Sequence, residues 1–229
     1  MTSRRHTATP AATSTASPVK RGGARTALLE AAVDVIRAQG LHATTVDDLC
    51  AAAGVTKGAF FHHFPSKDAL AVAAADHWSE TTGALFATAP YHAPPTAAGR
   101  VLAYLDFRAA LIVGAPAEFT CLVGTMTQEV FATNPAIRDA CAASILGHAA
   151  TLEADLAEAL ADADADPALT AAGLAVHTQT VLQGAFVVSK AADDPHIVLD
   201  SITHLRRYFM CVLGIEEPAR RPRSATRKE

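Results

Sequence analysis

The chain has 229 residues, of which 50% are hydrophobic and 18% charged, and its formal net charge is −4. These values predict a soluble globular protein with a substantial core and argue against a disordered or uniformly basic chain. The charge is uneven, because residues 1–75 carry eight Lys and Arg against five Asp and Glu, whereas residues 76–215 carry six against fifteen. We therefore expect any DNA to dock at the N-terminal part and to be repelled by the acidic remainder.

The sequence has no pattern that indicates secretion or membrane insertion. Its four cysteines have no paired spacing, and Arg4 and Arg5 are followed by Thr, Ala, Ser and Pro rather than by an apolar run. The charge-free stretch 167–189 is long enough to cross a bilayer, but it includes polar side chains such as Gln179 and Gln183. We expect a cytoplasmic protein with reduced thiols, no membrane contact and no cofactor.

The N-terminal arm, residues 1–23, is rich in Thr, Ala, Ser and Pro and is predicted to be disordered. It is either a plain tail or an arm whose basic residues follow DNA phosphates or the minor groove. The first helix is expected from Arg25 to Gln39, because apolar residues recur on one face and Gly40 can end it.

The residues after position 44 have the pattern of two short helices joined by a glycine turn. Thr45 is placed to cap the first helix, and Asp48, three residues later, completes a capping box. Gly54 supplies the left-handed residue that ends this helix, and Thr56 is placed to cap the second. This arrangement is typical of a DNA-reading helix-turn-helix.

The second of these helices is expected to turn a small and polar face toward DNA. Its inner face carries Ala59, Phe60 and Phe64, while small residues on the outer face let the backbone approach a groove. An ordinary helical hairpin with a solvated second helix is the alternative that this pattern alone leaves open. The residues expected to contact DNA are Arg25, Thr45, Thr56, Lys57, Gly58, Phe61, His62 and Lys67.

The stretch from Arg25 to Leu70 resembles the DNA-binding domain of the TetR family of one-component bacterial transcriptional regulators. The family pattern is matched by Ala-Gly-Val-Thr-Lys-Gly at residues 53–58, by His-Phe at residues 63–64 and by Ser-Lys-Asp at residues 66–68. One position departs from it, because Phe61 stands where the family usually has a tyrosine whose hydroxyl bonds a DNA phosphate. The resemblance implies a DNA-binding regulator, more often a repressor than an activator.

The rest of the chain is predicted to be helical, which gives an all-α fold of about nine helices. A linking helix over residues 66–87 is expected to join the two parts. The expected domains are a helix-turn-helix DNA-binding domain over 24–70, a larger helical effector-binding and dimerisation domain over 71–214 and a charged tail over 215–229. Further helices are expected over residues 96–113, 117–133, 135–161, 167–192 and 195–213.

A homodimer and an effector are both expected. One helix-turn-helix reads few base pairs, so we expect a two-fold dimer on a palindromic DNA operator. The last two helices are the most apolar, and the family resemblance also implies that they pair; alternatively they only complete the monomer core. The apolar bulk of the middle helices is expected to hold a small-molecule effector, although each candidate could be plain core. Those candidates are Trp78, Tyr104, Phe119, Cys121, Met126, His148, His177 and Phe186.

Cys121 supports an alternative form of regulation. The segment from Cys121 to Val130, with Lys190 later in the chain, looks like a TetR subgroup in which some members sense electrophiles or oxidants. A thiol near a helix N-terminus and a lysine has a lowered pKa, whereas the simpler interpretation is a small buried hydrophobe. The sequence thus predicts a ligand-responsive repressor, with thiol sensing through Cys121 as the alternative.

Other function classes fit the sequence less well. Cys121 with His148 or His177 would be the nucleophile and base of an enzyme, but nothing orients them and the sequence has no glycine-rich phosphate loop. Residues 162–166 begin like a calcium loop, but the required later glycine and glutamate are missing, so no metal is expected. A purely architectural DNA-binding protein would not need the large acidic body.

Overall fold

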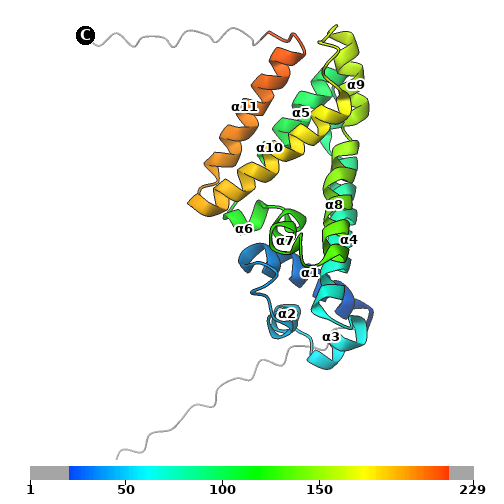
Figure 1. The fold of residues 1–229 in the computed structure, drawn as a ribbon, viewed down its shortest axis with the longest axis vertical. Coiled ribbons are helices and arrows are strands. Elements are labelled where there is room, and N and C mark those ends of the chain that lie inside the picture. The colour runs from blue at the N-terminus through cyan, green and yellow to red at the C-terminus, as the bar shows by residue number, and fades with distance from the viewer. Residues whose placement is uncertain (1–20, 217–229) are drawn as a thin grey trace, which may run out of the picture.

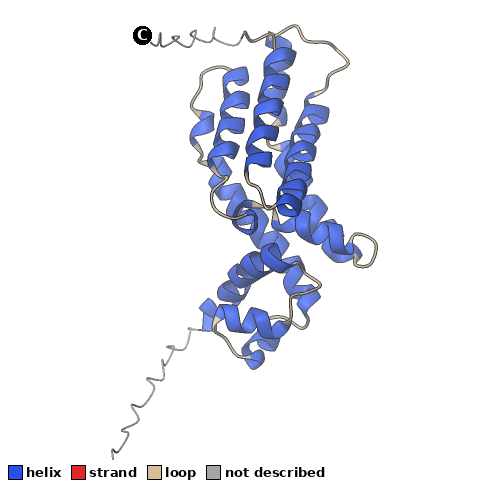
Figure 2. Cartoon of the chain, turned by 90° about the vertical axis from the view of Figure 1, so that its left-hand side faces the viewer, coloured by secondary structure: helices blue, strands red, loops and turns tan. Residues whose placement is uncertain are grey.

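The computed structural model describes residues 21–216, which form eleven α-helices and one short 3-10 helix, with no strand in this range (Figures 1 and 2). The all-α prediction is confirmed. The predicted arm before residue 21 and the tail after residue 216 lie outside the described residues. The helices are α1 (Arg21–Gln39), α2 (Val46–Ala53), α3 (Lys57–His63), α4 (Lys67–Ala87), η1 (Pro90–His92), α5 (Ala97–Ala110), α6 (Pro116–Phe119), α7 (Leu122–Val130), α8 (Pro135–Ala150), α9 (Glu153–Asp162), α10 (Ala171–Ala192) and α11 (His196–Val212).

The helix-turn-helix forms as its local sequence predicts. The Asp48 backbone N–H donates to the Thr45 hydroxyl at 3.1 Å, and the Thr45 N–H donates to the Asp48 carboxylate at 2.8 Å. Gly54 is left-handed, with φ of 64°, and ends α2. The Thr56 hydroxyl then accepts from the Ala59 N–H and caps α3. Each cap satisfies a backbone donor that would lack a partner in the first turn, which stabilises a helix by about 1 kcal/mol.

Two of the predicted helices are each divided in two. The expected helix over 117–133 is α6 and α7, because Thr120 and Cys121 adopt extended backbone angles, with ψ of 162° and 124°. The expected helix over 135–161 is α8 and α9, which are separated at residues 151–152. Among the other boundaries, α1 begins at residue 21, inside the segment predicted to be an arm.

The helices that are predicted to read DNA share one hydrophobic core with part of the C-terminal half. This core contains Leu28, Phe60 and Leu70 from α1, α3 and α4, together with Met126 from α7 and Ile137 from α8. All five side chains are fully buried. The N-terminal helices are therefore packed directly on α7 and the start of α8.

A second core holds the body of the molecule together. It joins α5, α9, α10 and α11 around large buried side chains such as Tyr104, Leu182 and Phe209. The helices α4 and α8 run side by side from the DNA-reading end toward the body, and α10 packs against α11 along one side (Figure 1). The two cores thus lie at opposite ends of the α4–α8 pair.

By length and composition alone, α10 is the one described helix that could cross a membrane. Its polar side chains Thr178, Gln179 and Ser189 are nevertheless buried against other helices. The mixture of buried and exposed positions along α10 is that of a core helix with one free face.

Candidate nucleic-acid interface and ligand cavity

The outer face of the helix-turn-helix is polar and open to solvent. Phe60 and Phe64 are 0% and 3% exposed and anchor α3 to the core, whereas Phe61 is 55% exposed on the opposite face. An aromatic ring held in solvent is available to contact a sugar or a thymine methyl group. The small and polar residues predicted to face DNA are likewise exposed: Thr45, Thr56, Lys57, Gly58 and His62.

The basic groups of this face are few, and one of them is paired. The Lys57 ammonium lies 2.8 Å from the carboxylate of Asp47 on α2, and both side chains are exposed. That hydrogen bond raises the pKa of Lys57. Arg25 is exposed on α1, with its guanidinium 5.4 Å from the centre of the Phe64 ring. For Lys57 to make the predicted contact with a DNA phosphate, it would have to exchange Asp47 for the phosphate or share the two.

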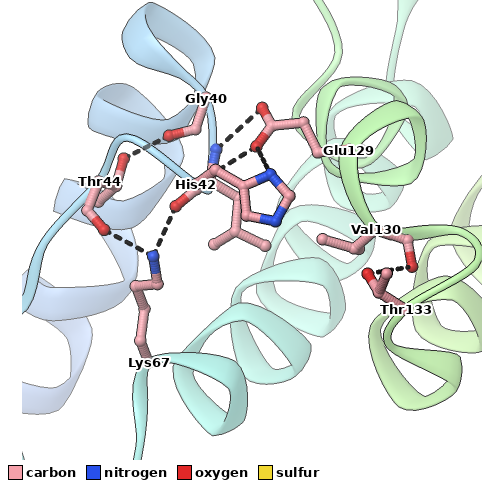
Figure 3. Close-up of polar contacts among 8 residues, drawn as sticks. Gly40, His42, Thr44, Lys67, Glu129, Val130 and Thr133 are labelled. Carbon is pink, nitrogen blue, oxygen red and sulfur yellow. Dashed lines mark hydrogen bonds and ion pairs between the residues drawn. The ribbon is translucent and has the colours of Figure 1, made fainter.

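Lys67 is turned inward rather than toward solvent (Figure 3). Its ammonium donates to the backbone carbonyls of Leu41 and Thr44, each at 2.8 Å. These carbonyls belong to the loop between α1 and α2. Lys67 thereby fixes the position of that loop. Its third N–H is still available, so the contact with a DNA phosphate stays a prediction.

Glu129 of α7 holds the same loop from the other side (Figure 3). Its carboxylate accepts from the backbone N–H groups of Leu41 and His42 at 3.1 and 2.7 Å, and the His42 ring lies at 3.4 Å. Gly40 has a φ of 87°, and a side chain there would collide with this carboxylate. The α1–α2 loop is thus fixed between a cation from α4 and an anion from the body.

A cavity of about 550 Å³ lies between the two cores. Such a volume is within the range of roughly 300–1,000 Å³ that is usual for small-molecule pockets. The helices α1, α4, α5, α6, α7, α8 and α10 all contribute side chains, and α1 belongs to the part predicted to read DNA. Of the predicted effector residues, the cavity wall includes Trp78, Phe119, Cys121, His148 and Phe186.

Three predicted effector residues lie elsewhere. Met126 is fully buried in the core shared with the DNA-reading helices, because its face of α7 packs on α1 and α4. His177 is exposed on α10, with its ring centre 5.3 Å from that of Tyr208 on α11. Tyr104 is buried beside the cavity and touches a lining residue through its hydroxyl, which lies 3.0 Å from Nε2 of His148. Helical periodicity shows which residues share a face of a helix, but it could not tell whether that face meets the cavity, a core or solvent.

Several polar residues line the cavity without having been expected there, and the largest of them with a cationic or amide group are Arg37, Arg108, Gln179 and Gln183. Their common signal is a charged or amide side chain inside an otherwise apolar stretch of helix. Such a residue is costly to bury unless it finds a polar partner. When the neighbours of a long helix are unknown, however, such a side chain is equally compatible with a position in solvent.

Arg37 connects the cavity to the DNA-reading helices. Its guanidinium donates to the carbonyls of Glu118 at 2.9 Å and Thr120 at 3.4 Å, and it lies 5.5 Å from the centre of the Trp78 ring. Its own backbone carbonyl accepts from the Lys190 ammonium at 2.9 Å. One residue near the end of α1 thus contacts α4, the α6–α7 segment and α10.

A neutral polar chain crosses the cavity wall. The Gln179 amide donates to the Tyr104 hydroxyl at 3.3 Å, and this hydroxyl pairs with His148. Burial, and secondarily the positive charge of Arg108, lower the pKa of His148 to about 4. His148 is therefore uncharged at neutral pH and offers a ligand hydrogen bonding without charge.

Cys121 occupies the N-cap position of α7 and is partly exposed. It and Lys190 line the same small cavity of about 260 Å³ next to the main one. The Lys190 ammonium, however, donates to the Arg37 carbonyl and the Thr125 hydroxyl, each at 2.9 Å. Burial, followed by the charge of Arg37, lowers the pKa of Lys190. These contacts give Lys190 a structural role and do not favour an activated thiolate at Cys121.

Two family models match the chain. "Bacterial regulatory proteins, tetR family" matches residues 28–74, and "Tetracyclin repressor-like, C-terminal domain" matches residues 97–205. The chain belongs to the TetR family. TetR-family proteins are transcriptional regulators that bind DNA and act as dimers, so this chain is a DNA-binding regulator built on a helix-turn-helix.

Individual relatives agree with this assignment. The HTH-type transcriptional repressor KstR2 of Rhodococcus jostii (strain RHA1) is 44% identical over 50 residues, which are 22% of this chain and only 24% of that repressor. A TetR-family regulator from Agrobacterium tumefaciens has a similar structure, with a TM-score of 0.73 and 17% identity over 82% of this chain and 98% of that one. Reduced NemR from E. coli gives a TM-score of 0.66 with 21% identity over 80% of this chain and 96% of that one. At these identities the two structures support the fold alone.

Proposed function

We propose that this TetR-family protein is a repressor that leaves its operator when a small molecule enters the 550 Å³ cavity. The observation that carries the proposal is the position of Arg37, which is part of α1 and also part of the cavity wall. A ligand that touches Arg37 or Trp78 acts directly on the helix that packs against the DNA-reading pair. The proposal therefore needs no additional chain of residues to connect the effector with the DNA.

The route from the cavity to the DNA is short. α1 ends soon after Arg37, and the loop that follows is held by Lys67 and Glu129 before α2 begins. A shift of the end of α1 is therefore passed to the α2–α3 pair by fixed hydrogen bonds. Because the coupling between two binding sites is reciprocal, operator DNA must also weaken effector binding by the same factor.

A homodimer on a palindromic operator fits this scheme. α10 exposes an apolar and small-residue stripe on the side away from its core. Two such stripes would bury each other, and two reading heads would then reach successive turns of the major groove. Effector binding would change the spacing of these heads. The exposed positions of the stripe are Gly173, Val176, Thr180, Gly184, Val187, Val188 and Ala191. We place the protein in the cytoplasm, where its operator would be.

The test has two steps with the full chain. Fluorescence anisotropy against labelled DNA from the intergenic region beside its own gene should show specific, salt-sensitive binding, compared with scrambled DNA of equal length. A set of small molecules is then screened for release of that DNA. Absence of any specific binding would exclude the regulator as proposed, and binding that no molecule reverses would exclude effector control.

The variant Cys121→Ser distinguishes thiol-based release from release by a reversibly bound ligand. If electrophiles release the wild-type protein and not Cys121→Ser, thiol sensing would replace the reversible ligand as the signal. We expect Cys121→Ser to respond to effectors like the wild type, because Lys190 is held by Arg37 and Thr125 rather than by the thiol.

A further inference from the structure

The charged groups of the main cavity are mostly positive. Arg37 and Arg108 are its two cations, and Glu118 is its one carboxylate. The Glu118 carboxylate is already committed, because it accepts the Ala115 backbone N–H at 2.6 Å and caps α6. His148 is neutral at pH 7. An incoming ligand therefore meets a wall with a surplus of positive charge.

Arg108 is the cation that is free to receive a ligand. Among residues 21–216 its guanidinium has no hydrogen-bond acceptor and no ion-pair partner, although the side chain is half-buried. The two terminal nitrogens of the Arg37 guanidinium, in contrast, are occupied by the carbonyls of Glu118 and Thr120 and by the carboxylate of Asp34, and only its buried Nε has no partner among the described residues.

Aromatic rings hold Arg108 in place. Its guanidinium lies 5.2 Å from the ring centre of Phe86, 5.9 Å from that of Phe186 and 6.0 Å from that of Tyr104. These rings bring no oxygen or nitrogen acceptor to the guanidinium, so its N–H donors stay available to a ligand. Such a fixed fork matches the two oxygens of a carboxylate or sulfonate.

The remaining wall suits an apolar body. Trp78, Leu85, Phe86, Ile112, Phe119 and Phe186 all line the cavity. These side chains would cover the hydrocarbon part of a ligand, while Arg108 binds its acidic group.

We infer that the effector is an amphipathic organic anion, whose carboxylate or similar acidic group pairs with Arg108 while its apolar or aromatic body fills the cavity. This inference rests on the proposed function, because it identifies the chemical class of that effector. Neutral molecules of the same shape are expected to bind more weakly.

Two fluorescent probes with a common skeleton test the anion site. 1-Anilinonaphthalene-8-sulfonate carries a sulfonate, and N-phenyl-1-naphthylamine has the same rings without it. The full-length protein should bind the sulfonate about tenfold more tightly or better, since a charge-assisted hydrogen bond has that worth. Arg108→Met should remove this preference and leave the neutral probe within about twofold. Arg138→Met removes an equal charge from an exposed site on α8 outside the cavity and should change neither affinity.

Several outcomes would overturn the anion site. Equal binding of the two probes to the wild type would do so, and so would an equal loss of both in Arg108→Met. Arg108→Lys keeps the charge and should retain part of the preference. If Arg108→Met does not fold, the ratio of the two probe affinities in the wild type and in Arg108→Lys still tests the anion site. A wild type without a preference for the sulfonate ends the inference.

DNA release in the same samples separates this inference from the proposed function. Selective binding of the sulfonate through Arg108, with operator DNA retained for every probe, would keep the anion site and count against effector control. Release of the DNA by both probes at equal affinity would keep effector control and overturn the anion site.

Discussion

Lys57 and Asp47 lie opposite each other on the face that is predicted to contact DNA. Their separation of 2.8 Å and their exposure make the pair a competitor for phosphate rather than a support for the fold. An exposed ion pair contributes about 0–1 kcal/mol to stability, so its loss is tolerated. Its effect on DNA binding should be larger, because the carboxylate both occupies Lys57 and repels phosphate.

Asp47→Asn should therefore strengthen DNA binding. We expect a lower Kd at every salt concentration and a steeper salt dependence, by about one unit in the slope of log K against log salt, since one more phosphate is neutralised. Anisotropy titrations between low and physiological salt measure both quantities. Asp162→Asn, at the exposed end of α9, removes an equal charge far from the motif and serves as the control. An unchanged slope would show that Lys57 already reaches the phosphate.

His148 makes the stability of the fold depend on pH. Its pKa is lowered from an ordinary value of 6.5 to about 4 because the ring is buried and Arg108 is near. The unfolded chain binds a proton below pH 6.5, whereas the folded chain resists protonation down to about pH 4. The free energy of unfolding is therefore undiminished by His148 above pH 6.5 and decreases as the pH falls, because only the unfolded chain takes up the proton.

We expect the free energy of unfolding to decrease between pH 6.5 and 4, by up to about 3 kcal/mol from this residue alone. Urea unfolding of the wild type and of His148→Gln at several pH values measures the difference, because glutamine can still bond Tyr104 but does not titrate in this range. His204→Gln, on the exposed side of α11, should keep the wild-type pH dependence. Parallel curves for the wild type and His148→Gln would contradict the assignment.

The loop between α1 and α2 is the element on which the two halves of the chain converge. Glu129 satisfies two of its backbone N–H groups and Lys67 two of its carbonyls (Figure 3). Removing a partner from a part-buried backbone group costs about 1–3 kcal/mol, because the group loses its hydrogen bond without regaining water.

Glu129→Ala should lower the stability by about 1–3 kcal/mol, and Glu129→Gln by less, because its amide oxygen can still accept. Thermal and urea unfolding of purified variants measure the loss. Glu158→Ala, which removes an exposed partner of Arg100, should cost less than about 1 kcal/mol. If Glu129→Ala and Glu158→Ala proved equally mild, the loop would not depend on the body.

At the level of elements, the sequence predicted what local chemistry decides. Thr45, Gly54 and Thr56 fix the helix-turn-helix through hydrogen bonds within a few residues, so their pattern was sufficient. The breaks at residues 120–121 and 151–152 were not predicted, because neither contains a proline or glycine. Tertiary packing determines where these helices break. For the same reason the sequence could not show that Met126 lies on a face of α7 that is turned away from the cavity.

The exposed stripe of α10 belongs to the scale of the whole molecule. Val176, Val187 and Val188 are between 41% and 52% exposed on a helix whose opposite side is buried. Apolar side chains clustered on one face of a soluble protein mark an interaction surface more often than isolated ones do. The dimer we propose would cover them.

Val188→Glu should therefore dissociate the dimer without unfolding the monomer. Sedimentation velocity should show a monomer, and operator affinity should fall steeply because one reading head makes only half the contacts. Leu146→Glu is a matched control, since Leu146 of α8 is 54% exposed and Val188 is 52% exposed. A dimer that persists in Val188→Glu would place the interface elsewhere.

The core that the DNA-reading helices share with α7 and α8 limits how such regulators can be recombined. Leu28 and Phe60 are buried in the same cluster as Met126 and Ile137, so a junction placed at residue 70 would cut through packed side chains. A chimera that exchanged only the reading head would set foreign shapes against each other and leave voids. We therefore expect a DNA-binding part that can be transplanted to include α7 and the first turns of α8, so that operator choice and the proposed response to a ligand would be inherited together.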